Sequence, residues 1–255
     1  MRLLHEETTT SAGEAFDDEV EVAILPTGSV EQHGPALPLG TDFLAAEAVA
    51  RGIDRDDAVV LPTVPVGVSA HHRQFDGTLW AEPETFEDYV GEICASIASH
   101  GVDKLVICNG HGGNEDALRR AARRLRGDRI AFAAPWNWWS SLDGLDEELF
   151  DRSGIGHADA METSMVAHVA GELVREAELA EAEAGAADSW GKSVHGAGVG
   201  FDTADFSESG AVGRPTEGTA EKGERLYAQA TDELDALVGW LAAQPFDALM
   251  PEPHR

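Results

Sequence analysis

Three short apolar runs, each ending in a loop that carries glycine, histidine or carboxylate side chains, constrain the fold of this chain most strongly. The runs are Val20–Leu25, Ala58–Val66 and Lys104–Cys108, and each is typical of a buried β-strand. Helical patterns separate them, including Phe43–Ile53 and a helix framed by Pro83 and Gly101. Strands that alternate with helices predict an α/β fold with a mainly parallel central sheet.

The 255 residues show no internal repeat, low-complexity tract or linker, so they fit one large domain with a substantial core. We expect residues 1–18 to form a polar arm and residues 19–255 to form the single catalytic domain. No apolar run is long enough to span a membrane, and the first residues lack the apolar segment of a signal peptide. Cys94 and Cys108 suit a reducing compartment. We therefore expect a cytoplasmic protein without a membrane partner.

Acidic residues dominate the composition, with 47 Asp and Glu against 18 Lys and Arg and a net charge of −29. A phosphate backbone requires a protein surface of the opposite sign, so nucleic acid is not expected as a partner. The acidic residues are spread over nearly every segment, which argues against an acidic tail. Such a surface repels itself in dilute buffer and is tolerated when salt screens it. A salt-rich cytoplasm is the habitat that this composition favours.

Candidate metal ligands gather at the ends of the predicted strands, where open α/β sheets place their reactive groups. Glu31 and His33 follow the first strand, His71 and His72 follow the second, and His111 follows the third. Asp42, at the start of the next helical pattern, adds a second carboxylate. Carboxylate and imidazole side chains are ligands of divalent metals.

Two plainer interpretations compete with a metal site. The first motif could be a polar loop whose Thr41 or Asp42 caps a helix. The glycine-rich stretch 109–114 could cradle a phosphate at a helix N-terminus. However, it lacks the Lys-Ser/Thr ending of a P-loop and the spacing of a dinucleotide-binding motif.

The second half of the chain carries less specific signals. Trp136, Trp138 and Trp139 lie close together, and such clusters more often pack in a core or a subunit interface than against a substrate. The remaining patterns are a helix over His157–Val174, an irregular glycine-rich stretch over 189–213 and a long amphipathic helix over Thr216–Ala243.

Four motifs in order resemble those of the creatininase family of metal-dependent amidohydrolases: GSVEQHGPALPLGTD, GVSAHHRQFDGTL, ICNGHGGNED and HADAMETS. A fifth stretch, GAVGRPTEGTAEKGER, resembles the closing motif of that family. The resemblance covers the chain from about residue 22 to its end. It implies a single three-layer α/β/α domain, two divalent ions in one pocket of each subunit, and a homohexamer.

The resemblance also assigns roles by position. Glu31, His33, Asp42 and His111 match metal ligands, with Asp42 placed to bridge both ions, and Glu162 is taken as the fifth ligand. Zn²⁺, Mn²⁺ and Fe²⁺ all suit this set of nitrogen and oxygen ligands.

Three further residues complete the expected site. His157 matches the catalytic histidine, which would carry a proton from water to the leaving nitrogen. Ser69 and His72 are candidates for substrate contact, with ordering of their loop as the alternative role for either.

Three positions depart from the pattern of the family. Creatinine-hydrolysing members have a ligand glutamate two positions after the counterpart of His111, where this chain has Gly113. His71 stands in place of the glutamate of a Glu-His pair, and Asp76 in place of a proline. The change at Gly113 argues against creatinine itself as the substrate.

These residues predict hydrolysis of a non-peptide C–N bond in a small cyclic amide or formamide by a metal-activated water. One alternative is a formamidopyrimidine deformylase of flavin or deazaflavin biosynthesis. Another is a peptidase that trims the precursor peptide of a redox cofactor. A catalytically silent metal-binding oligomer is the hypothesis from another class, and the complete ligand set together with His157 argues against it.

Overall fold

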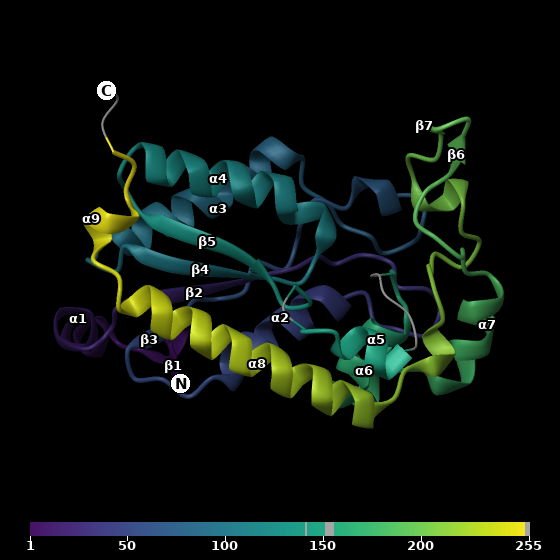
Figure 1. Cartoon of the computed structure of the whole chain (residues 1–255), viewed down its shortest axis with the longest axis horizontal. Coiled ribbons are helices and arrows are strands. Elements are labelled where there is room, and N and C mark those ends of the chain that lie inside the picture. The colour runs from purple at the N-terminus through teal and green to yellow at the C-terminus, as the bar shows by residue number, and fades with distance from the viewer. Residues whose placement is uncertain (141, 151–155, 253–255) are drawn as a thin grey trace.

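A five-stranded parallel sheet forms the centre of the computed structural model, which describes residues 1–140, 142–150 and 156–252. The strand order is β1-β3-β2-β4-β5, and each neighbouring pair runs parallel (Figure 1). The strands are β1 (Arg2–Leu3), β2 (Val22–Thr27), β3 (Ala58–Val60), β4 (Lys104–Asn109) and β5 (Phe132–Asn137). The central pair, β2 and β4, is buried along its whole length, as the apolar runs predicted.

Helices cover both faces of the sheet, which confirms the three-layer α/β/α architecture (Figure 1). One layer contains α3 (Pro83–Ala98) and α4 (Glu115–Gly127), and the other contains α2 (Thr41–Gly52) and α8 (Ala220–Ala242). Successive strand residues point to opposite faces. Accordingly, Ala23 and Leu25 of β2 pack in the α3–α4 core cluster, while Val22 and Ile24 pack in the α2–α8 cluster.

The remaining elements lie around this frame. α6 (Ala160–Val169) packs on α8 and α2. The others are α1 (Thr9–Asp18), α5 (Leu145–Phe150), α7 (Leu179–Ala184), α9 (Phe246–Leu249) and the antiparallel hairpin of β6 (Ser193–Val194) and β7 (Ala197–Gly198). The hairpin stands away from the sheet, at the end where α5, α6 and α7 lie (Figure 1).

The first 18 residues differ from the polar arm that we expected. Leu3 pairs with Val60 in the parallel ladder of β1 and β3, and its side chain is buried in the α2–α8 cluster. Thr8 and Ser11 then form a reciprocal capping box that starts α1. A two-residue strand is too short to give a hydrophobic pattern, so the sequence did not reveal it. The start of this segment therefore packs on the sheet and does not extend away from it.

Lys104 joins the start of β4 to the end of α8. Its side chain is almost fully buried, and its Nζ donates to the main-chain oxygens of Ala242 at 2.8 Å and Gln244 at 3.3 Å. The same ammonium contacts Glu21 Oε2 at 2.8 Å. A buried lysine with these three partners fixes one end of the long C-terminal helix to the sheet.

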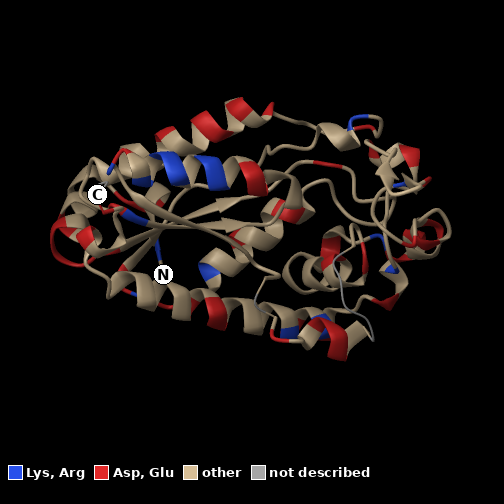
Figure 2. Cartoon of the chain, turned by 45° about the horizontal axis from the view of Figure 1, so that its top comes forward, with Lys and Arg blue, Asp and Glu red and all other residues tan. Residues whose placement is uncertain are grey.

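Acidic residues are distributed over nearly all elements, while the largest group of basic residues lies on α4 (Figure 2). Two arginines of α4 pair with α3, Arg120 with Glu87 at 2.6 Å and Arg124 with Asp88 at 2.8 Å. These ion pairs join the two helices of one layer, so α4, which carries five of the 18 Lys and Arg residues, faces carboxylates of the same chain. Within the described residues, no helix has the length and apolar character needed to cross a membrane.

Candidate metal centre

Backbone geometry at the ends of β2 and β4 brings the predicted ligands together. Glu31 and His33 lie in the loop that follows β2, Asp42 lies in the first turn of α2, and His111 follows β4. A Cβ at Gly110 would collide with the main-chain oxygen of Asp42. Only glycine therefore lets the loop after β4 rest directly on the first turn of α2, where His111 meets Asp42.

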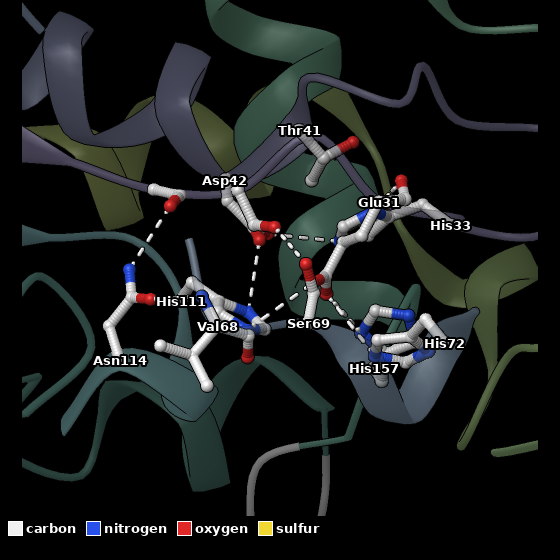
Figure 3. A network of polar contacts seen from close by, with 12 residues as sticks. Glu31, His33, Thr41, Asp42, Val68, Ser69, His72, His111, Asn114 and His157 are labelled. Carbon is white, nitrogen blue, oxygen red and sulfur yellow. Dashed lines mark hydrogen bonds and ion pairs between the residues drawn. The ribbon is translucent and has the colours of Figure 1, made fainter. Parts of the chain in front are cut away.

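Five side chains converge in one cluster, as Figure 3 shows for all but Glu162. Asp42 lies at its centre, with Oδ1 3.0 Å from His33 Nε2 and Oδ2 3.1 Å from His111 Nδ1. Glu31 Oε2 lies 3.2 Å from His111 Nε2, and Glu162 Oε2 lies 3.6 Å from His33 Nε2. The structure thus brings together all five residues that the sequence analysis assigned as ligands.

The cluster contains buried polar atoms that need a partner. Among the described residues, both carboxylate oxygens of Glu31, Nε2 of His33 and of His72, and Oδ2 of Asp42 are buried and lie beside other ionisable groups of the cluster, without a hydrogen bond to any group outside it. Buried polar groups without hydrogen bonds are costly, and their clustering commonly marks an ion or ordered water. Carboxylate oxygen and imidazole nitrogen suit Zn²⁺, Mn²⁺ or Fe²⁺, so these residues fit divalent metal ions.

The charges of the cluster affect its pKa values. Burial raises the pKa of Glu31, but His111 and His72 outweigh burial and hold that pKa well below its usual value. Burial lowers the pKa of His33, but the carboxylates of Asp42 and Glu162 hold it well above its ordinary value. The charged form of Glu31 is thus stabilised by nearby positive charge, and bound divalent ions would supply such charge.

Among the described residues there are three sets of three residues in which each residue offers one possible ligand atom. Within each set, these atoms lie within 4.8 Å of one another. Glu31, Asp42 and His111 form one set, and His33, Asp42 and Glu162 form another, so Asp42 belongs to both. The third set, Glu31, His33 and His157, shares Glu31 with the first set and His33 with the second, and adds His157. The first two sets together contain all five expected ligands, and Asp42 is common to both.

The loop after β4 contributes no carboxylate beside His33, because the position where one is expected is Gly113. A Cβ at Gly113 would collide with Val68 O and with His111 Nε2, so this loop has no space for a side chain in its present conformation. Glu162 instead approaches His33 from α6. The second carboxylate beside His33 therefore belongs to α6 and not to the loop after β4.

His157 does not lie on a helix, contrary to the helix predicted over His157–Val174. The helix α6 begins at Ala160, with Asp159 as its N-cap, and Ala158 has a positive φ of 49°. Two main-chain hydrogen bonds join His157 to Val212. The position of His157 is therefore set by this bridge and by the turn before α6.

The ring of His157 faces the cluster. Its Nδ1 lies 3.7 Å from Glu31 Oε1, and its Nε2 lies 2.8 Å from the main-chain oxygen of Gln32. Burial, followed by the neighbouring His33 and His72, lowers the pKa of His157 to about 3. The ring is consequently neutral near pH 7, with one protonated nitrogen and one that can accept a hydrogen bond.

The two substrate-contact candidates differ in position. His72 lines the pocket above the cluster, with Nε2 3.3 Å from Glu31 Oε1. Ser69 is fully buried and does not belong to the pocket lining formed by the described residues. Its hydroxyl bonds to Ser29 Oγ at 2.8 Å and to Leu79 O at 2.9 Å. The structure therefore does not place Ser69 at the pocket and favours its alternative role, ordering the loop.

A pocket of about 530 Å³ opens above the cluster and has aromatic walls. Trp138 and Trp139 line it, and Trp138 is at the same time buried in the core, one of the positions that the sequence analysis expected for the tryptophan cluster. Trp190 and Phe201 line it from the segment that carries the β6–β7 hairpin. The ring of Trp190 packs edge-on against His157 at a centroid distance of 6.0 Å.

Sequence reasoning missed Trp190 and Phe201, together with Gln32 and Thr203, which contact the site histidines. Two aromatic residues in an otherwise glycine-rich stretch were the available signal for the pocket wall. Gln32 lies between two predicted ligands, but its side chain carries no metal-binding signal of its own.

Comparisons with known proteins match nearly the whole chain. The profile of the creatininase family, described as creatinine amidohydrolase, matches residues 5–238. A mycofactocin precursor peptide peptidase of Mycobacterium ulcerans is 33% identical over 220 residues, which are 82% of this chain and 81% of that protein. A creatinine amidohydrolase of Pseudomonas putida is 27% identical over 171 residues, 60% of this chain and 66% of that protein.

Solved structures share the fold. A crystal structure of creatinine amidohydrolase (creatininase) superposes with a TM-score of 0.78 and 22% sequence identity, covering 95% of this chain and 98% of the other.

Proposed function

This chain belongs to the creatininase family of hydrolases acting on carbon–nitrogen bonds, and from that premise we propose that it hydrolyses an amide with two divalent metal ions. Glu31, Asp42 and His111 would hold one ion, and His33, Asp42 and Glu162 the other. Bound there, the ions would supply Lewis acidity toward the amide carbonyl and increase the acidity of water. The observation that carries this proposal is the convergence of two sets of ligands on Asp42 beside a pocket.

His157 is the proposed proton carrier. Its Nε2 is occupied by the main-chain oxygen of Gln32, while Nδ1 faces Glu31 and the pocket. Nδ1 would accept a proton from the attacking water and deliver it to the leaving nitrogen, because hydrolysis of an amide releases an amine that must be protonated. The aromatic walls would limit the access of bulk water to the reacting groups.

A small cyclic amide or formamide is the first substrate class. The pocket volume of about 530 Å³ lies within the usual range of small-molecule sites, roughly 300–1,000 Å³. Its tryptophan walls can stack on a planar ring, and the polar cluster forms one end. A formamidopyrimidine combines both chemical features.

A peptide is the second substrate class, and a specific observation favours it. The mycofactocin precursor peptide peptidase matches 82% of this chain, whereas the creatinine amidohydrolase of Pseudomonas putida matches 60%. The absence of a side chain at Gly113 also separates this chain from the creatinine-hydrolysing pattern. The same residues can cleave a peptide bond, because the reacting group is again an amide.

The test is a substrate panel. Protein reconstituted with Zn²⁺ or Mn²⁺ at molar salt is incubated with creatinine, a formamidopyrimidine and short peptides, and products are followed by mass spectrometry. We expect turnover of at least one class that is lost in His157→Ala. If the metal-loaded protein turned over none of the three, or if His157→Ala were as active as the wild type, the proposal would fail.

The family resemblance and the composition support three further features of this proposal. We infer a cytoplasmic homohexamer. A net charge of −29 opposes subunit association until salt screens it, so we also infer that the protein works in a salt-rich environment. Light scattering at molar and at low salt would test this. Monomers at molar salt would contradict the hexamer.

A further inference from the structure

Gln32 lies between two proposed ligands, and its side-chain amide has one defined orientation. The side chain is 3% exposed. Its Oε1 accepts from the main-chain N–H of Gly34 at 3.0 Å, and its Nε2 donates to the main-chain oxygen of Gly210 at 3.1 Å. A main-chain N–H only donates and a carbonyl only accepts, so these two bonds identify the oxygen and the nitrogen of the amide.

The amide of Gln32 determines which nitrogen of His72 carries the proton. Nε2 of Gln32 has two hydrogens, of which one goes to Gly210. The other lies near two ring nitrogens, His72 Nδ1 at 2.8 Å and His157 Nε2 at 2.9 Å, and goes to His72 because His157 Nε2 is itself a donor to the main-chain oxygen of Gln32 at 2.8 Å. His72 Nδ1 must therefore accept, and the hydroxyl of Thr203, also at 2.8 Å, is a second donor to it. The proton of neutral His72 consequently lies on Nε2, which faces Glu31 Oε1 at 3.3 Å.

The same residue determines the tautomer of His157. His157 Nε2 lies 2.8 Å from the main-chain oxygen of Gln32 and 2.9 Å from its Nε2. The main-chain oxygen can only accept, and an unprotonated Nε2 would place its lone pair against it. His157 Nε2 must therefore carry the proton and donate it to the carbonyl. Nδ1 stays unprotonated on the side of Glu31.

We propose that Gln32 is a positioning residue that sets the tautomers of His72 and His157, so that His72 presents a proton to Glu31 and His157 presents a free Nδ1 to the substrate. This inference rests on the proposed function in taking His157 as the proton carrier. Gly210 supports the arrangement, because its φ is +89° and a Cβ there would collide with the side-chain oxygen of Gln32. Glycine at this position leaves the amide the space that it occupies.

Two variants disturb Gln32 by independent routes. Gln32→Met keeps the length of the side chain and removes both of its donor hydrogens, whereas Gly210→Ala displaces the amide and leaves Gln32 unchanged in sequence. The matched control is Gln229→Met on α8, where the side-chain amide of Gln229 donates to Glu233 Oε1 of the same helix at 3.1 Å. Each protein is labelled with ¹⁵N-histidine and loaded with Zn²⁺. Long-range ¹H–¹⁵N spectra then report which ring nitrogen is protonated, with kcat, KM and zinc content measured alongside.

We expect His72 and His157 of the wild type to be single Nε2–H tautomers, and both variants to show tautomer mixtures with unchanged zinc content. Turnover should fall roughly 10- to 100-fold, the usual effect of losing a hydrogen-bond partner of an active-site histidine, with little change in KM. Gln229→Met should match the wild type in every measurement.

Three results would overturn the proposal: an Nδ1–H tautomer at either histidine in the wild type, retention of single tautomers in both variants, or unchanged turnover despite mixed tautomers. The wild-type spectrum decides the first result even if a variant does not fold. If the wild type turned over no substrate of the panel, the proposed function would fail while the spectra still tested the tautomers.

Discussion

Asp42→Asn should remove more metal than any other single change at the site. Asp42 belongs to both proposed sets of ligands, whereas Glu31 and Glu162 serve one each. Replacing a hydrogen-bond partner of a ligand already weakens metal binding about 10- to 100-fold. The loss of one of three direct ligands should therefore cost at least about 100-fold, or ~2.8 kcal/mol, at each ion. Asparagine keeps the shape of the side chain, so the change isolates the loss of charge and coordination.

The assay is elemental analysis of zinc-loaded protein after gel filtration into metal-free buffer at molar salt. We expect about two ions per chain in the wild type, about one in Glu31→Gln and in Glu162→Gln, and fewer than one in Asp42→Asn. Asp76→Asn is the matched control, because Asp76 is an exposed carboxylate outside the three sets of ligands. Circular dichroism confirms that each variant is folded.

Two ions retained in Asp42→Asn would refute the bridging role. A different pattern would move the second ion: if His157→Ala lost an ion and Glu162→Gln kept both, the set of Glu31, His33 and His157 would be the occupied one.

Four further measurements test other parts of the structure. His157→Ala should keep both ions while turnover falls about 10²- to 10⁴-fold, the range for a lost acid–base group; a kcat equal to that of the wild type would contradict this. The melting temperature should rise with salt as the Debye length shortens from about 10 Å at 0.1 M to about 3 Å at 1 M; an unchanged value would rule out the salt requirement. Lys104→Met should lower the free energy of unfolding by about 2–4 kcal/mol, because two main-chain oxygens lose a buried donor while half-exposed Glu21 loses little; an unchanged urea midpoint would show that these bonds add nothing. Burial raises the pKa of Cys94 to about 12 and also raises that of Cys108, so both thiols should react with a thiol reagent at pH 8 only after unfolding; fast labelling of native protein would contradict their burial.

The ends of the strands, and the candidate metal ligands that follow them, could be predicted from the sequence because both depend on local signals. An apolar run identifies a buried strand, and a parallel sheet brings the carboxyl ends of its strands to one edge. Glu31, His33 and His111 follow from that geometry alone. Their partner Glu162 came from the family resemblance, since no local pattern relates α6 to the edge of the sheet.

Residues fixed by tertiary contacts could not be predicted in this way. The segment with Trp190 and Phe201 has no periodicity, and its position depends on contacts such as that of Thr203 with His72. His157 had a helical pattern around it, yet its bridge to Val212 holds it ahead of the helix. For His157, the long-range contact with Val212 outweighs the local helical propensity. For the segment with Trp190 and Phe201, there was no local pattern to use.

The two proposed sets of ligands become complete at different stages of chain synthesis. Glu31, Asp42 and His111 are all present once the chain has been made past His111, just after β4 and within the first half of its 255 residues. Glu162 comes later, on α6, which packs mainly against the C-terminal helix α8. On the proposed assignment, an ion bound to the first set would stabilise the β2–β4 pair on the nascent chain, and the second ion would wait until the last long helix had docked. Metal uptake during refolding should then occur in two phases, the slower one timed by the docking of α8.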